Sequence, residues 1–88
     1  MSMFGAEVAA LRSFAQQVEA RVRDLRSTLS RLEQRLGELN WTGPDHDRFV
    51  EQWQSVHRPR LVSAAADLDG VRDQALLAAD RQDDASNS

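Results

Sequence analysis

A long apolar repeat in the first part of the chain places the strongest constraint on its fold. Apolar side chains recur from residue 4 to residue 39 at alternating steps of four and three: Phe4, Val8, Leu11, Ala15, Val18, Val22, Leu25, Leu29, Leu32, Leu36 and Leu39. Such spacing, kept over several heptads, is typical of a helix that packs along one side. A helix over 4–39 would be about 54 Å long. It cannot bury this seam alone, so it needs a partner helix.

A cluster of turn residues follows the repeat. Gly43 and Pro44 end a helix and permit the chain to reverse over 40–44. Thr42, with Asp45 three positions later, reads as a capping box. The next helix is therefore expected to begin near residue 45.

Three aromatic side chains lie in or just after this turn. Trp41 stands inside the turn, and Phe49 and Trp53 are four residues apart on one face of the next helix. Because a large indole gains nothing from a solvated loop, we expect Trp41 to fold back as a lid and bury much of its ring. Phe49 and Trp53 are expected to pack at the same end of the hairpin.

The second helical pattern covers 45–79 and contains a slip. Its apolar seam begins as Phe49, Trp53 and Val56, then resumes one residue late as Leu61, Ala64, Leu68, Val71, Ala75 and Ala78. Pro59 lies inside the slip, where a helix-interior proline costs about 3 kcal/mol. We therefore expect a kink near residue 59 or a π-type widening that absorbs the extra residue, with a complete break at Arg58 as the alternative. Residues 81–88 lack large apolar side chains and are predicted to form a disordered tail.

These patterns predict an all-α fold, an antiparallel helix-turn-helix hairpin over residues 1–80. A chain of 88 residues buries only a small core, so we expect the hairpin to dimerise into a four-helix bundle. The seam widens near its start, where a possible dimer surface comprises Phe4, Ala10, Leu11 and Phe14. The alternative interpretation of Phe14 is an isolated exposed side chain, which is common in soluble proteins.

Composition excludes several classes of function. The net charge is −3 without a clustered basic face, which argues against nucleic acid. The absence of cysteine removes disulfides, thiolate metal sites and cysteine nucleophiles. His46 and His57 are eleven residues apart, too far along one helix to share a metal ion. We therefore expect a non-enzymatic protein without catalytic, metal or cofactor residues.

Two further patterns concern membranes and export. The chain has no apolar run long enough to span a bilayer. Its first residues lack the basic and apolar regions of a Sec signal peptide. If the protein leaves the cell, another route is expected to recognise it in folded form.

The Trp41-Thr42-Gly43 motif lies between two helical segments, with Phe49 and Trp53 on the second. In this motif, in its length and in its layout, the chain resembles the WXG100 (ESAT-6-like) family of type VII secretion substrates. The resemblance implies a secreted, extracellular protein without a cleavable signal peptide, paired in the cytoplasm. It implies a homodimer, or a heterodimer with another WXG100-like protein or a helical effector domain, and recognition by a type VII secretion ATPase. Trp41 and Gly43 would form half of a composite secretion signal.

The second half of that signal is degenerate here. In the family it is a Y-x-x-x-D/E motif at the end of the second helix, but this chain contains no tyrosine. The nearest match runs from Leu76 to Asp80, which keeps the acid and the spacing but not the aromatic ring. This departure favours a heterodimer with a tyrosine-bearing partner. The alternative function is a cytoplasmic coiled-coil scaffold, or a chaperone for a larger effector, in which the W-x-G turn is only a structural cap.

Overall fold

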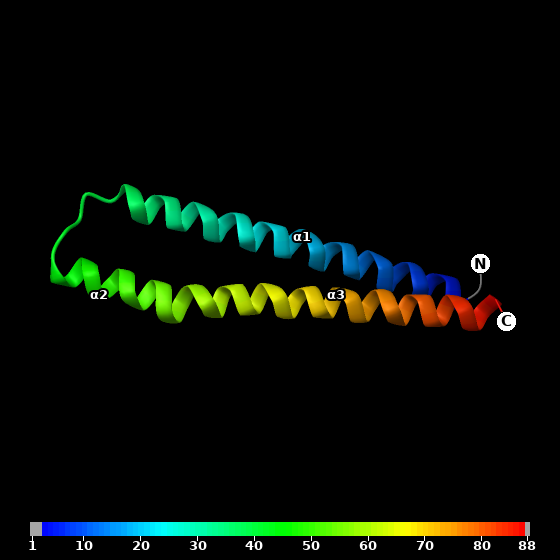
Figure 1. The fold of residues 1–88 in the computed structure, drawn as a ribbon. Coiled ribbons are helices and arrows are strands. Elements are labelled where there is room, and N and C mark those ends of the chain that lie inside the picture. Colours follow the sequence, from blue (N-terminus) through cyan, green and yellow to red (C-terminus); the bar gives the residue numbers. More distant parts are fainter. Residues whose placement is uncertain (1–2, 88) are drawn as a thin grey trace.

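The computed structural model describes residues 3–87, and the side chains of residues 5–86. It contains α1 (Met3–Glu38), α2 (Pro44–Gln52), a π-helix η1 (Trp53–His57) and α3 (Arg58–Asn87), and no strand within the described range. The last three elements are continuous, so the chain forms two antiparallel rods joined by one turn, with both termini at the opposite end (Figure 1). The predicted all-α hairpin is confirmed. None of the described helices is long and apolar enough to cross a membrane.

The hairpin is a thin rod. The Cα atoms extend over 66 × 18 × 12 Å and have a radius of gyration of 19.7 Å. A compact domain of this length would have a radius of gyration of about 12 Å. Because two helices touch along a single line, the buried core consists of small side chains: Val8, Ala15, Val18, Val22, Leu29, Ala65, Ala75 and Ala79.

The predicted seam of α1 faces the second rod. Val8, Ala15, Val22 and Leu29 follow each other at heptad spacing and are all buried. Leu11, Leu25 and Leu36 are half-buried, whereas Leu32 and Leu39 remain exposed. Phe4 lies within α1, but its side chain falls outside the described set.

The predicted seam of α3 is wrong by one position over part of its length. Ala65 and Ala79 are buried, whereas Ala64, Leu68 and Val71 are exposed. Alanine occupies neighbouring positions here, so the sequence pattern alone does not select a face. Ala65 and Ala79 lie on the side that meets α1, where small side chains allow close approach of the two helices.

The slip in the second seam takes the form of η1. The backbone N–H of Arg58 donates to the carbonyl of Trp53, five residues earlier. This wider turn absorbs the extra residue, as the spacing predicts. Because α3 begins directly at Arg58, the helix is not broken there. Pro59 lies in the first turn of α3.

The predicted disordered tail over 81–88 requires correction. α3 continues to Asn87, and Ser88 lies beyond the described residues. Residues 81–87 contain no glycine or proline that would stop a helix. Arg12 of α1 also forms ion pairs with Asp80 and Asp83, at 3.4 and 3.6 Å, which hold this segment against α1.

Candidate functional site

The turn owes its shape to Gly43 and Pro44. Gly43 is the N-cap of α2, with φ 112° and ψ 179°, and Pro44 is at the first helical position. The Asp47 N–H donates to the Gly43 carbonyl at 3.0 Å. This φ/ψ region is essentially restricted to glycine. The predicted capping box at Thr42 is wrong: no side chain caps α2, because its start is fixed one residue later by the Gly-Pro pair.

Trp41 packs against the first turns of α2. Its ring centroid lies 5.4 Å from that of His46 in a T-shaped arrangement and 5.6 Å from that of Phe49. Trp41 nevertheless keeps 38% of its surface exposed. Its ring contacts among the described residues are therefore with α2, and Trp41 is more open than the predicted lid.

An apolar groove lies between the end of α1 and the helix that follows the turn. Leu32, Leu36 and Leu39 line one side, and Phe49 and Trp53 line the other. The groove has a volume of about 250 Å³, and its one charged lining residue is Arg35. The Trp53 indole N–H is buried without an acceptor. Phe49 and Trp53 thus meet the end of α1, but they leave a groove instead of closing it.

A second groove lies towards the other end of the hairpin. Phe14, Val18 and Leu68 supply its apolar surface, together with Gln17 and Arg21, and its volume is about 230 Å³. Phe14 is 49% exposed. Because Leu68 of α3 shares the groove, Phe14 is not an isolated apolar side chain. Of the other predicted surface residues, Ala10 is exposed and Leu11 is half-buried.

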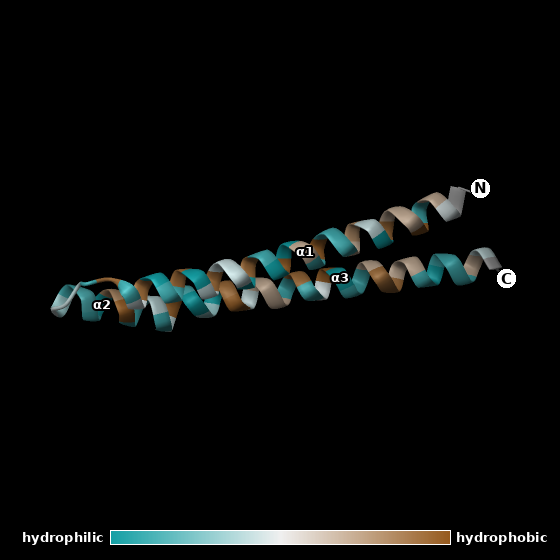
Figure 2. Ribbon diagram, turned by 90° about the horizontal axis from the view of Figure 1, so that it is seen from above, coloured by the Kyte–Doolittle hydropathy of each residue, from teal (hydrophilic) through white to brown (hydrophobic). Residues whose placement is uncertain are grey.

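Both grooves belong to what we call the apolar flank of the hairpin. We define it by its exposed large side chains: Phe14, Leu32, Leu39, Phe49, Leu68 and Val71. Val71 follows Leu68 by three residues, which places it on the same face of α3. Figure 2 shows apolar stretches recurring along both rods between polar ones.

On the other side of the hairpin, charged side chains form ion pairs between the two rods. Arg12, Arg26 and Glu33 of α1 pair across the interface with acids and an arginine of α3, and we call this side the ion-paired flank. Arg12 meets Asp80 and Asp83, Arg26 meets Asp69 at 2.7 Å, and Glu33 meets Arg58. The two flanks therefore differ in chemistry. The charged side chains of the ion-paired flank have partners within the chain, whereas the large side chains of the apolar flank remain exposed.

A short network extends the ion-paired flank along α3. Asp69 accepts from Arg26 and, at 3.2 Å, from Arg72 of its own helix. The hydrogen bond from Arg72 to Asp73 and the charges of Asp73, Asp69 and Glu19 raise the pKa of Arg72 above its ordinary value. The Arg72 guanidinium thus stays charged at any ordinary pH.

The two predicted halves of a secretion signal lie far apart in one chain. Leu76 is exposed on α3, and Asp80 pairs with Arg12 near the termini. Trp41 and Gly43 lie at the turn, at the opposite end of the rod (Figure 1). Within one chain, therefore, the end of the second rod does not lie next to the turn.

Over the described residues, no three His, Cys, Asp or Glu side chains are placed to hold a metal ion. His46 contacts Trp41 and the Asp47 carboxylate, and His57 is exposed at the end of η1. The surface instead carries an apolar flank with two grooves and a turn of defined backbone shape.

No family model matches the chain, and neither a curated protein nor a solved structure matches it.

Proposed function

We propose that the protein is a non-enzymatic secretion substrate or adaptor that acts through helical dimerisation. The observation that supports this proposal is the difference between the two flanks. The ion-paired flank is closed within the chain, whereas the apolar flank exposes six large side chains. Exposed large apolar side chains gathered on one side of a small protein are typical of an interaction site. A second hairpin laid along this flank would complete a four-helix bundle.

The dimerisation step is tested by replacing Phe14. Phe14 and Leu77 are both 49% exposed, but Leu77 does not line either groove of the apolar flank. Phe14→Ser should weaken association at least tenfold, because it removes the aromatic side chain from one of the two grooves of the proposed interface. Leu77→Ser is the matched control and should leave association unchanged. Sedimentation equilibrium over a concentration series measures both, and equal effects of the two changes would contradict the proposal.

Export is the second part of the proposal and rests on the W-x-G turn. Trp41 keeps an exposed edge beside Phe49, where a partner or a type VII secretion ATPase could contact the indole. Trp41→Phe retains an apolar ring against α2, so the loss of stability should be about 1 kcal/mol or less. Helicity and dimerisation should persist, while the secreted fraction falls. Phe49→Leu should behave in the opposite way, with export falling only as far as folding falls.

The assay compares culture supernatant and cell lysate in cells with and without an intact secretion ATPase, with circular dichroism as the measure of folding. Normal export of Trp41→Phe, or export that does not depend on the ATPase, would remove the secretion proposal. A specific observation then favours the scaffold or chaperone alternative. Gly43 is explained by its backbone angles alone, as a residue that shapes the turn.

A further inference from the structure

The two rods are packed together over only part of their length. Among the described residues, the buried side chains of the second rod begin at Ala65, and α2 and η1 contain none. No Cα atom of these two helices comes within 8 Å of a Cα atom of α1. The ion pair between the rods that lies nearest the turn joins Glu33 to Arg58, at the start of α3. Residues 44–57 therefore stand away from α1, and Figure 1 shows the rods separating towards the turn.

The groove at the turn end lies in this gap. Its walls are Leu32, Leu36 and Leu39 on one side and Phe49 and Trp53 on the other. Leu32, Leu39 and Phe49 are 48%, 55% and 48% exposed. Two apolar walls of one chain thus face each other while both remain in contact with water. Bringing the walls together would remove this apolar surface from water, which is favourable.

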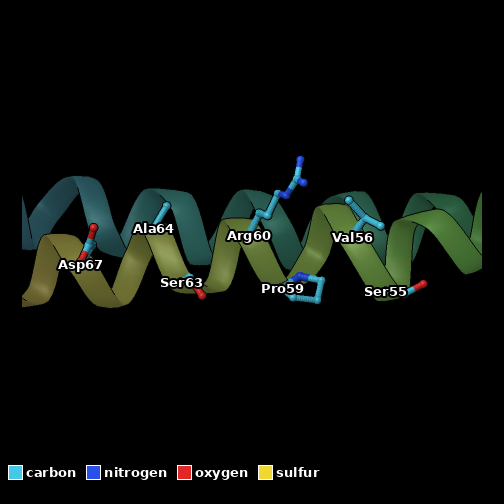
Figure 3. Close-up of a pocket in the computed structure, with 7 residues that line it drawn as sticks. All are labelled: Ser55, Val56, Pro59, Arg60, Ser63, Ala64 and Asp67. Carbon is cyan, nitrogen blue, oxygen red and sulfur yellow. The ribbon is translucent and has the colours of Figure 1, made fainter.

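The second rod has a joint between these residues and its packed part. In η1 the Arg58 N–H donates to the Trp53 carbonyl, five residues earlier, where an α-helix would use four. Pro59 follows directly and has no N–H, so a carbonyl in the preceding turn lacks its helical donor. Figure 3 shows only the small side chains of Ser55 and Ser63 beside Pro59 on this face of the helix. Because helices bend at prolines and π-turns, the second rod bends most easily at this joint.

The other end of α2 is attached through the turn. Residues 39–43, which connect α1 to α2, are all exposed. Trp41 contacts His46 and Phe49 of α2, so its ring moves with that helix. A segment with no buried side chain, between a joint and an exposed turn, belongs to the least stable part of a fold.

We propose that α2 and η1 form a lid, which bends at the joint and closes onto the end of α1, so that Phe49 packs on Leu32 and Leu36. The structure holds the lid in its open position. Closing removes the groove at the turn end and leaves the groove around Phe14 accessible. The lid therefore controls how much of the apolar flank a partner can reach. It acts within one chain and does not rest on the proposed dimerisation.

Charges do not oppose this movement. The charged residues of the lid are Asp45, Asp47, Arg48 and Glu51, and those of the facing end of α1 are Arg31, Glu33, Arg35 and Glu38. With histidine neutral, three acids and one arginine give the lid a net charge of −2, and two arginines and two acids give the end of α1 a net charge of zero. Because one surface is acidic and the other is neutral, closure brings no two surfaces of like net charge together.

Spin labels can measure the position of the lid, because the chain has no cysteine and a label attaches only where one is introduced. Gln34→Cys and Glu51→Cys place one label on the end of α1 and one on the lid, both at exposed positions. Arg23→Cys and Ala66→Cys form the control pair, next to the buried cluster that joins the rods. Double electron–electron resonance gives the distances, and singly labelled chains reveal any distance between molecules. Circular dichroism confirms that each variant is helical.

The lid pair should show two distances, the longer one matching the open structure. The shorter one is that of helices packed with their axes about 8–10 Å apart. The control pair should show a single distance, because the rods are already packed there.

Three substitutions test what closes the lid. Phe49→Ser should lower the ratio of closed to open chains at least tenfold, because a large apolar side chain leaves the closing surface. Leu77→Ser is the matched control and should leave the ratio unchanged, since Leu77 is 49% exposed but lies outside the groove. Pro59→Ala should lower the ratio about fivefold, because the restored helical hydrogen bond opposes the bend.

Three results would contradict the lid. The first is a single distance in the lid pair, equal to that of the open structure. The second is a shorter distance that Phe49→Ser and Leu77→Ser reduce equally, since closure would then not depend on the groove. The third is a shorter distance that singly labelled chains show as well, because it would arise between molecules.

Discussion

Gly43 provides the sharpest test of how this turn is built. The residue has φ 112° and ψ 179°, and an added Cβ atom would meet nothing within 4 Å. Gly43→Ala therefore introduces backbone strain without a steric clash. A non-glycine residue in this region costs about 1–3 kcal/mol. Reduced freedom of the unfolded chain returns about 0.4–1 kcal/mol. Taking the middle of each range, we expect a net loss of stability of about 1 kcal/mol.

Gly70 supplies a control with the opposite sign. It lies within α3 and, like Gly43, has open space around the position of a Cβ atom, but its φ is not in the left-handed range. Glycine inside a helix is less stable than alanine by about 0.5–1 kcal/mol. Gly70→Ala should therefore stabilise the protein by this amount. The same chemical change should thus raise stability at one position and lower it at the other.

Urea unfolding followed by circular dichroism measures both variants. The protein concentration must be held constant, because the apparent stability of an associating protein depends on it. A difference of 1 kcal/mol corresponds to a shift of about 4–8 °C in Tm for a domain of this size. If Gly43→Ala is as stable as the wild type, or gains stability as Gly70→Ala does, the strained backbone is not what requires glycine in the turn.

Two further predictions concern the second rod. Pro59→Ala should raise the free energy of unfolding, measured by thermal unfolding, by well under about 3 kcal/mol, because the π-helix before Pro59 already accommodates the extra residue. A gain of about 3 kcal/mol would show that Pro59 is a defect in an otherwise regular helix. Ala79→Leu should destabilise the hairpin by about 1–3 kcal/mol in urea unfolding, because Ala79 is fully buried where the helices approach. Ala66→Leu, at an exposed position of α3, should change little, and an equal cost for both would contradict the assigned interface.

The ion-paired flank was not foreseen from the sequence. From the sequence, the charged side chains beside the α1 seam are expected only to face solvent. Whether such a side chain is solvated or ion-paired depends on the residue that lies across from it. Arg26 and Asp69 are 43 residues apart, and the relative shift of the two rods decides that they meet. Local charge spacing carries no signal for such a pair. The same relative shift of the rods leaves the large side chains of the apolar flank without a partner inside the chain.

The sequence by itself determined the elements and the long seam. Heptad spacing set the face of α1, since Val8, Ala15, Val22 and Leu29 repeat without interruption and all are buried. The slip before Pro59 set the place of η1, because one extra residue must be absorbed locally in a continuous helix.

Only the tertiary structure decided the register of α3. Ala64 and Ala65 are equally apolar, so the closeness of α1, not hydrophobicity, selected Ala65 for the interface. The cap, in contrast, is local: Gly43 and not Thr42 is the N-cap of α2, because Pro44 fixes the first helical residue. The helix continues over 81–87, where no glycine or proline stops it, and Arg12 of the other rod pairs with Asp83. For the register of α3, local preferences were balanced, and contacts between distant residues decided between the two faces.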